Sequence, residues 1–423
     1  MKYSYDEVIH IIQNTRRFGD YTGYQVSEYM LERLGNPQSG IPFVHVAGTN
    51  GKGSTTAFLC NILQQTGKRI GMFTSPHLIT FEERIRINGE YISKGDVTRI
   101  GNQLLEMEFA LPPTMFDYCL AMAMLYFKEQ QCDFMVIETG IGGRYDSTNA
   151  LGTPEVAIIT KIGFDHMGIL GDTLAEIAGE KAGIMKTGAP LVTQRQEPEV
   201  QEVLEKHYLE MMGDKKHYIC VTEADIERVK KYPMKMLGKF QMENAATAMK
   251  AADILMNKWY GMTMEHEREQ YIRKGIQNTF WKGRMELVRE NPFFMIDGAH
   301  NAHGVHALAE SLKDLYPGER FHFIMGVMAD KDYEDMIREL LPLARDFVTV
   351  TPECSRALQS RELAECIEKA GIQATYQEDM ELLIRPYLSE RYEGELVNDG
   401  TKTIAFGSLY FIGAIERMIE KYS

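Results

Sequence analysis

Residues 45–55 read HVAGTNGKGST and follow a short apolar run, Phe43–Val46. A strand, a glycine-rich loop and a helix in this order are typical of a phosphate-binding loop, because backbone N–H groups and the helix dipole both favour an anion. The loop departs from the standard pattern: Gly53, not Ser or Thr, follows Lys52, and Val46 stands where the first glycine is expected. The stretch predicts an α/β fold and a nucleotide site. A glycine-rich turn without a ligand is the alternative.

Short apolar runs alternate with helical patterns along most of the chain, which indicates mainly parallel sheets covered on both faces. The fold class is therefore α/β, with an N-terminal P-loop ATPase-like domain and a smaller C-terminal Rossmann-like domain. We expect the first domain at residues 1–282, a linker at 283–292 and the second domain at 293–423. The expected strands are Phe43–Val46, Arg69–Phe73, Phe134–Ile137, Val156–Ile162, Phe293–Ile296, His322–Met325, Phe347–Val350 and Thr403–Phe406, and the clearest helices are Ser54–Gln65 and Ala302–Leu315.

The composition is that of an ordinary globular protein and excludes some classes of function. The 423 residues carry a formal net charge of -14, which argues against a nucleic-acid backbone as the main partner. No apolar stretch approaches the roughly 18 residues of a membrane-spanning helix, so no membrane partner is expected. The six cysteines form no CxxC pair. They indicate small buried side chains in a reducing compartment, and the expected location is the cytoplasm.

Polar residues follow three of the expected strands, where open α/β sheets bind ligands. Ser75 lies in TSPHL, Glu138 begins a second glycine-rich loop, and His166 lies in GFDHMG. A carboxylate at a strand end suits Mg²⁺, which prefers hard oxygen ligands. Ordinary turns and a capping histidine are the alternatives. Lys181, in GEKAGI, taken alone resembles a solvated helix lysine.

A further group surrounds the start of the second expected domain. Arg284 lies in the expected linker, and Asp297 and His300 lie in IDGAHN at the end of a strand. These residues could close over a nucleotide held by the first domain, or they could make polar packing contacts between domains. Both interpretations stay open at this point.

Nine segments together resemble one family. The segments occur in order between residues 45 and 410: HVAGTNGKGST, TSPHL, the ERI of FEERIRING, ETGIGGRYDSTN, FDHMGILGDT, EKAGI, DGAHN, the DKD of MADKD, and GSLY. They resemble the folylpolyglutamate synthase and dihydrofolate synthase family, which is related to the Mur peptidoglycan ligases. The resemblance implies an ATP-dependent ligase that forms an acyl phosphate on a folate carboxylate and then an amide with L-glutamate.

The resemblance also implies roles for particular residues, with ATP and two Mg²⁺ ions as cofactors. The catalytic residues would be Lys52, His166 and Lys181, with Lys181 carrying a carbamate. The metal ligands would be Ser75, Glu138, His166 and Lys181. The ATP-binding residues would be Thr49, Asn50, Gly51, Lys52, Gly53, Ser54, Asn244, Arg284, Asp297 and His300. The folate-binding residues would be Phe116, Asp117, Arg144 and Asp146.

Two departures from the family pattern concern the acceptor substrate. This chain has Phe116-Asp117 where relatives often have Phe-Glu, and Gly23-Tyr24-Gln25-Val26 where they often have Gly-Leu-Glu-Arg. We favour a reduced folate as acceptor and leave open whether dihydropteroate is a second one. The resemblance implies a monomer. The rival hypotheses are a Mur-type UDP-muramyl peptide ligase, which usually carries an additional N-terminal domain, and a P-loop nucleotide switch.

Overall fold

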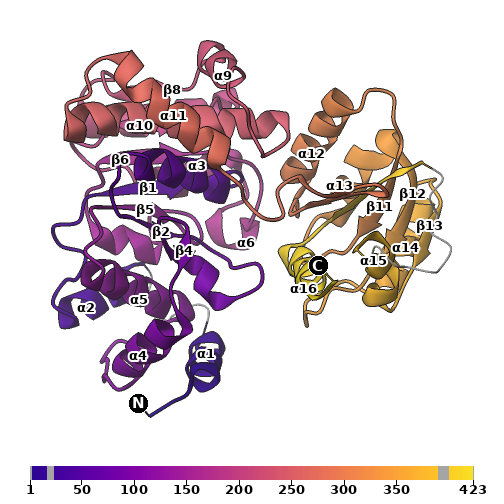
Figure 1. The fold of residues 1–423 in the computed structure, drawn as a ribbon, viewed down its shortest axis with the longest axis horizontal. Coiled ribbons are helices and arrows are strands. Elements are labelled where there is room, and N and C mark those ends of the chain that lie inside the picture. The colour runs from indigo at the N-terminus through magenta and orange to yellow at the C-terminus, as the bar shows by residue number, and fades with distance from the viewer. Residues whose placement is uncertain (1, 17–22, 389–399, 423) are drawn as a thin grey trace. The chain divides into compact units, whose positions relative to one another are not determined.

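The computed structural model describes residues 2–16, 23–388 and 400–422, which form two compact units (Figure 1). The first unit comprises Met1–Lys235 and Met242–Thr279, and the second comprises Met236–Gln241 and Phe280–Ser423. The prediction of a linker at residues 283–292 was wrong. Strand β9 (Glu286–Glu290) lies within that segment and pairs antiparallel with β10 (Phe293–Asp297), so the segment is part of the second unit's sheet.

The first unit is built on an eight-stranded sheet in the order β4-β3-β2-β5-β1-β6-β7-β8. Its strands are β1 Phe43–Ala47, β2 Ile70–Phe73, β3 Ile85–Ile87, β4 Glu90–Tyr91, β5 Phe134–Glu138, β6 Val156–Ile159, β7 Leu191–Thr193 and β8 Tyr218–Cys220. The six strands from β2 to β8 in this order pair in parallel, and β3 and β4 are antiparallel at one edge. The predicted mainly parallel sheet is confirmed. The strand that precedes the glycine-rich loop, β1, lies between β5 and β6.

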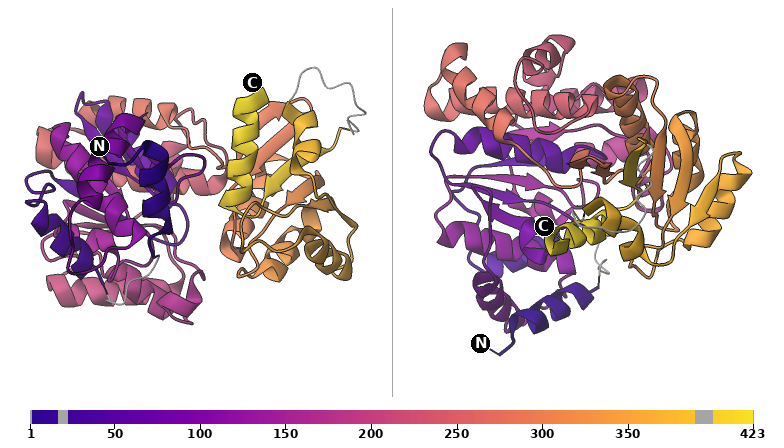
Figure 2. Two further views of the ribbon diagram at one scale, coloured as in Figure 1. Left: turned by 90° about the horizontal axis from the view of Figure 1, so that it is seen from below. Right: turned by 45° about the vertical axis from the view of Figure 1, so that its right-hand side comes forward.

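Helices cover both faces of this sheet, with α3, α10 and α11 on one face and α4 and α5 on the other (Figures 1 and 2). The helices are α1 Tyr5–Asn14, α2 Gln25–Arg33, α3 Lys52–Gln64, α4 Lys94–Leu105, α5 Met115–Glu129, α6 Met167–Leu170, α7 Leu174–Ala182, α8 Pro198–Met212, α9 Glu223–Val229, α10 Lys239–Tyr260 and α11 Glu265–Asn278, with 3₁₀ turns η1 Phe81–Arg84 and η2 Ser147–Leu151. Loops follow the carboxyl ends of β1, β2, β5 and β6. These are the strand ends at which the sequence predicts a site.

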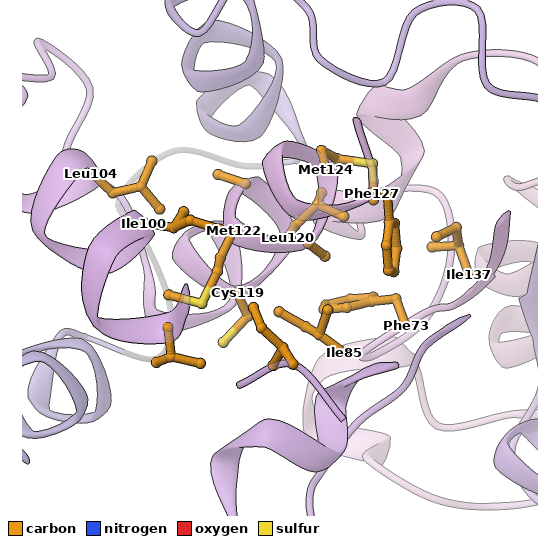
Figure 3. Close-up of a cluster of buried hydrophobic side chains, with 14 of the residues drawn as sticks. Phe73, Ile85, Ile100, Leu104, Cys119, Leu120, Met122, Met124, Phe127 and Ile137 are labelled. Atoms are coloured by element: carbon orange, nitrogen blue, oxygen red, sulfur yellow. The ribbon is translucent and has the colours of Figure 1, made fainter. Parts of the chain in front are cut away.

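Helix α5 shows how sequence and packing fix this arrangement (Figure 3). Thr114 and Asp117 form a capping box that begins the helix. The ring of Phe127 packs directly on β2, because Gly71 leaves no side chain in its way: a Cβ there would lie 2.9 Å from the ring. Full burial of a side chain of this size stabilises the fold by about 2–3 kcal/mol. The packing holds β2 and β5 in place, and with them the loops that follow.

The second unit has a six-stranded sheet in the order β13-β12-β11-β14-β10-β9, parallel except for β9. The further strands are β11 Phe321–Met325, β12 Ala344–Thr349, β13 Ala374–Tyr376 and β14 Lys402–Phe406. The helices are α12 Ala302–Leu315, α13 Tyr333–Leu340, α14 Ser360–Lys369, α15 Met380–Leu388 and α16 Leu409–Tyr422, with a 3₁₀ turn η3 Leu341–Leu343. Its core contains Phe321, Phe323, Phe347 and Phe406. The Rossmann-like prediction is confirmed. Among the described residues of either unit, no helix is long and apolar enough to cross a membrane.

Candidate active site

The loop between β1 and α3 requires glycine at two positions. Gly48 has φ 153°, and a Cβ built there would lie 1.8 Å from the hydroxyl oxygen of Thr160. Gly51 has φ 89°, and its Cβ would lie 2.4 Å from Oδ1 of Asn244. Positive φ is costly for any residue with a side chain, and the neighbouring atoms add a steric clash. The backbone of the loop is therefore shaped by Thr160 and Asn244.

The first part of the loop is tied to the segment after β6. The N–H groups of Thr49 and Asn50 donate to the carbonyl of Lys161 at 2.9 and 3.2 Å. The hydroxyl of Thr49 donates to the carbonyl of Gly163 at 3.0 Å and lies 3.2 Å from its N–H. Since these two backbone N–H groups are used within the protein, a phosphate would depend on those that follow.

The following groups belong to the first turn of α3, which begins at Lys52, two residues before the predicted start. Gly51 precedes the helix and provides no capping side chain. The first-turn N–H groups have no acceptor in the helix itself, and the helix dipole adds partial positive charge. Lys52, Gly53 and Ser54 therefore present a helix N-terminus of the kind that binds phosphate.

Two lysines meet at this loop. The ammonium of Lys52 donates to the carbonyls of Gly48 and Thr49 at 3.1 and 3.2 Å. The ammonium of Lys181, from α7, donates to the same Gly48 oxygen at 2.9 Å. Lys181 is only 3% exposed, so its interpretation as a solvated lysine was wrong. Burial, and next the charge of Lys52, lower the pKa of Lys181 to about 7.

Ser75 and Glu138, both predicted metal ligands, are brought together at the ends of the neighbouring strands β2 and β5. The N–H of Ser75 donates to Oε2 of Glu138 at 3.2 Å, and Glu138 is 4% exposed. His166 precedes α6 with φ 52°, and its N–H donates to Oδ1 of Asp165 at 2.9 Å. No three His, Cys, Asp or Glu side chains in the described part of the chain are grouped to hold a metal. A metal ion at Glu138 would therefore need other oxygen ligands, such as the Ser75 hydroxyl, water and phosphate.

Asn244 lies on α10 against the loop. It is 3% exposed, and its Oδ1 accepts from Nε2 of Gln194 at 2.8 Å and from the hydroxyl of Thr55 at 3.4 Å. The same oxygen is the atom that leaves no room for a side chain at Gly51. The sequence prediction placed Asn244 at the nucleotide, and the structure places it beside the phosphate-binding loop.

The two acidic residues predicted to bind folate make hydrogen bonds within the protein. Asp117 accepts from the hydroxyls of Ser27 and Ser147 through Oδ1, and from the N–H and hydroxyl of Thr114 through Oδ2. Asp146 accepts from the N–H groups of Gly140 and Ile141, both at 2.9 Å, and burial raises its pKa. These two carboxylates fix the positions of α2, α5 and the loop after β5 relative to one another.

The other two predicted folate residues are more accessible. Phe116 is half-buried: its ring lies 5.6 Å from that of Phe73 and leaves no room for a side chain at Gly140. Arg144 has a side chain that is 42% exposed and pairs with Glu180 at 3.3 Å. An apolar ring and a cation next to a glycine-rich loop suit an aromatic ligand that carries carboxylates.

His45, which the sequence analysis did not single out, also connects to this loop. It lies fully buried in β1, and Nε2 lies 2.7 Å from the hydroxyl of Thr148, which also contacts Asp146. Burial lowers the pKa of His45 to about 3, so the ring is neutral. The available signal was a histidine inside the otherwise apolar strand FVHVA. Through Thr148, the central strand supports the loop that follows Glu138.

Three of the predicted nucleotide contacts belong to the second unit and lie close together there: Arg284, Asp297 and His300. Asp297 is 3% exposed and accepts from the N–H groups of Met285 and Ala299, both at 2.8 Å. Burial raises its pKa, and the charge of Arg284 opposes this rise. The guanidinium of Arg284 lies over Gly298, where a Cβ would be 2.0 Å from Nη1. Nδ1 of His300 lies 2.7 Å from the carbonyl of Gly298.

Comparison with known proteins places the two units in one class. Residues 46–252 match the Mur ligase middle domain, and residues 283–397 match the Mur ligase, glutamate ligase domain. The two units thus contain the two domains that Mur ligases share.

Similar proteins and solved structures identify the family within this class. The dihydrofolate synthase/folylpolyglutamate synthase of Bacillus subtilis is 35% identical over 440 residues, which cover 99% of each chain. The structure of Mycobacterium tuberculosis folylpolyglutamate synthase complexed with ADP is 27% identical, with a TM-score of 0.82 and 98% of each chain covered. A folylpolyglutamate synthase–AMPPCP–folate complex is 26% identical, with a TM-score of 0.81 over 99% of this chain and 100% of that one. This chain belongs to the folylpolyglutamate synthase/dihydrofolate synthase family.

Proposed function

We propose that this protein is an ATP-dependent ligase that joins L-glutamate to the carboxylate of a reduced folate. The observation that carries this proposal is the convergence of Lys52 and Lys181 on Gly48 at a helix N-terminus, in a chain that matches its B. subtilis relative from end to end. A cation, Lys52, at a helix N-terminus suits a triphosphate. The relatives in complex with ADP, and with AMPPCP and folate, support the choice of ligands.

The reaction has two steps. An oxygen of the folate carboxylate attacks the γ-phosphorus of ATP, the bond to the β-phosphate oxygen breaks, and an acyl phosphate and ADP result. The amino nitrogen of L-glutamate then attacks the acyl carbon, phosphate leaves with the electron pair of the C–O bond, and the nitrogen loses a proton. Lys52 neutralises charge that develops on the transferred phosphoryl group, and the α3 N-terminus orients it.

We assign nucleotide-binding roles to residues in each unit, considered by itself. We assign the triphosphate to Gly51, Lys52, Gly53 and Ser54 in the first turn of α3, with Thr49 and Asn50 shaping the loop. Asn244, Arg284, Asp297 and His300 are assigned further nucleotide contacts. Arg284 is the residue of this last set that brings positive charge. Asp297 accepts from the N–H of Met285, the residue after Arg284, and from the N–H of Ala299, the residue after Gly298.

We assign two Mg²⁺ ions to the enzyme, because Ser75 and Glu138 carry hard oxygen atoms and follow adjacent strands. We assign Ser75, Glu138 and His166 to one ion and a carbamate on Lys181 to the second. When bound, Mg²⁺ would neutralise phosphate charge and align the phosphoryl group. In this assignment Glu138 keeps its carboxylate fixed through the N–H of Ser75.

The burial of Lys181 supports the proposed carbamate. A lysine whose pKa is lowered to about 7 has a large neutral fraction at physiological pH. The neutral amine attacks CO₂ to form a carbamate and releases a proton. The product is an anionic oxygen ligand that would relieve the repulsion between Lys181 and Lys52.

The acceptor would lie against Phe116 and Arg144. We assign the pteridine ring to Phe116 and acceptor carboxylates to Arg144. Asp117 and Asp146 belong to the same site, where their present hydrogen bonds fix the shape of the loop after β5. We propose that a reduced folate is the main acceptor and that dihydropteroate is a second one, as the paired name of the B. subtilis relative suggests.

We further propose that the enzyme acts as a monomer in the cytoplasm. All six cysteines are free thiols, and three of them are buried, which suits a reducing compartment.

Isotope-labelled L-glutamate tests the proposed function. The protein is incubated with ATP, labelled glutamate and either tetrahydrofolate or dihydropteroate, and the products are analysed by mass spectrometry. Label in an amide-linked product of tetrahydrofolate supports the proposal. Label only in a dihydropteroate product would restrict the enzyme to dihydrofolate synthesis. Label only in a muramyl peptide supplied in parallel would refute the folate assignment.

A further inference from the structure

The turn that carries Arg284 has a strained backbone and is held by several hydrogen bonds. Gly283 has φ 66° and Met285, which has a side chain, has φ 45°. The carbonyl of Gly283 accepts from the N–H of Gly298 at 2.8 Å. The N–H of Met285 donates to Asp297, and the N–H of Gly283 donates to Oε2 of Glu286 at 2.7 Å. Such backbone persists only where the surrounding structure determines it, so these contacts set the position of Arg284.

Two neighbouring carboxyl groups, the buried Glu416 and the half-buried Glu286, lie next to this turn. Glu416, on α16, is 1% exposed, and its carboxyl group lies within hydrogen-bond reach of that of Glu286. The ammonium of Lys282 lies 3.2 Å from Oε2 of Glu416. Oε1 of Glu416 is buried, and no N–H or O–H group of the described residues donates to it. Two ionised carboxylates cannot hydrogen-bond to each other, so this contact requires a proton on one of them.

The charges around Glu416 show which of its protonation states is favoured. The groups that face it are Glu286 from β9 and Lys282 from the preceding segment. Glu420, one turn further along α16, also pairs with Lys282 at 3.2 Å, from a side chain that is 58% exposed. One ammonium is therefore shared between two carboxyl groups, those of Glu416 and Glu420, and Glu286 adds a third carboxyl group next to Glu416. Keeping one of them protonated avoids an uncompensated charge at the buried position.

We propose that Glu416 stays protonated at neutral pH, donates to Glu286, and thereby acts as a positioning residue for Arg284. Glu286 is held by Glu416 on one side and holds the N–H of Gly283 on the other. Arg284 follows directly and lies against Gly298 with no spare room. Loss of the proton would set two negative charges against each other and displace Glu286 from Gly283. The proposal rests on the proposed function, in which Arg284 contacts the nucleotide.

The electrostatics agree with this geometry. Burial, and next the neighbouring Glu286, raise the pKa of Glu416 from 4.5 to about 8. The folded state therefore binds more protons than the unfolded state between these two values. Stability falls as pH rises through this window, and no further loss from this group occurs above it.

The test compares wild type with Glu416→Gln in the full-length protein. Glutamine keeps a hydrogen-bond donor toward Glu286 but cannot ionise. Glu286→Gln also leaves only one carboxyl group in the pair, in this case that of Glu416. Glu420→Gln is the matched control, since it removes the exposed partner of the same Lys282. Urea-unfolding midpoints are measured from about pH 5 to about pH 8. ATP dissociation constants are measured by calorimetry at about pH 7 and about pH 9.

We expect the unfolding midpoint of wild type to fall with pH relative to that of Glu416→Gln, with Glu420→Gln following wild type. We expect ATP binding by wild type to weaken by about fivefold more than that by Glu416→Gln between the two pH values, a coupling at the low end of the usual range. Parallel stability profiles would overturn the buried proton. A stability difference without an ATP difference would overturn the positioning role. If wild type bound no ATP at either pH, the proposed function itself would fail, and the stability profiles alone would decide the protonation of Glu416.

Discussion

Lys52 and Lys181 donate to the same backbone oxygen, the carbonyl of Gly48, at 3.1 and 2.9 Å. One carbonyl dipole balances only part of the positive charge of Lys52, so the site can accept an anion, and burial beside Lys52 lowers the pKa of Lys181. This shared acceptor joins the phosphate loop to α7.

Replacement of Lys52 by alanine removes a charge that acts on the transferred phosphoryl group. We expect kcat to fall by about 100-fold or more, in line with other losses of electrostatic transition-state stabilisation. Initial-rate measurements of ADP release check this. Lys68→Ala, which removes an exposed lysine paired with Asp133, is the control and should leave the rate unchanged. A wild-type rate in Lys52→Ala would refute the assigned role.

Replacement of Lys181 by alanine separates a carbamate from a simple ammonium. The variant should lose activity, and short carboxylates added to the assay should restore part of it, because they supply an oxygen ligand in the space left by the side chain. Intact-mass spectrometry of the active wild-type enzyme provides the second measurement. An active enzyme with an unmodified lysine would count against the carbamate.

Gly48 should tolerate no side chain. Alanine at this position would meet Thr160 at 1.8 Å, whereas Gly67, also at positive φ, has open space around its Cβ position. We expect Gly48→Ala to lower the free energy of unfolding by about 1–3 kcal/mol more than Gly67→Ala does, as for other overpacked sites. Urea denaturation measures both. The double variant Gly48→Ala/Thr160→Ala should recover part of the loss, and its failure to do so would contradict the steric explanation.

Glu138→Gln tests the proposed metal site without a change of shape. The amide oxygen can still accept from the N–H of Ser75, but the negative charge is lost. We expect the Mg²⁺ concentration for half-maximal activity to rise by about 10-fold or more, since Mg²⁺ sites in proteins depend on carboxylates. Glu129→Gln, at an exposed ion pair with Arg99, is the control. An unchanged Mg²⁺ requirement would exclude Glu138 as a ligand.

The strand, loop and helix around HVAGTNGKGST could be predicted because their signals are local. An apolar run, three glycines and a helical pattern lie within about twenty residues, and the observed β1 and α3 differ from the predictions by two residues at most. Strand β9 gave no such signal. Its sequence ELVRE is partly exposed along its length and lies at a sheet edge, between Gly283 and Pro292, so it resembled a linker.

The residues of the candidate site also divide into those that the sequence could predict and those that it could not. Residue type and position at a strand end indicated Ser75 and Glu138, and the structure brings them together. The hydrogen bonds of Asp117 could not be predicted, because Ser27 and Ser147 are distant in sequence and approach it only through tertiary packing. The burial of Lys181 has the same cause. Its contact with Gly48 spans 133 positions, and nothing in GEKAGI indicates it.

If the enzyme is a folate ligase, ADP release depends on both L-glutamate and a pteridine acceptor. ATP turnover is measured with L-glutamate alone, with tetrahydrofolate alone, with both together, and with dihydropteroate in place of tetrahydrofolate. We predict sustained ADP release only when glutamate and a pteridine acceptor are both present, and we predict its loss in Lys52→Ala. ADP release that needs no pteridine, or that requires a muramyl peptide instead, would contradict this prediction.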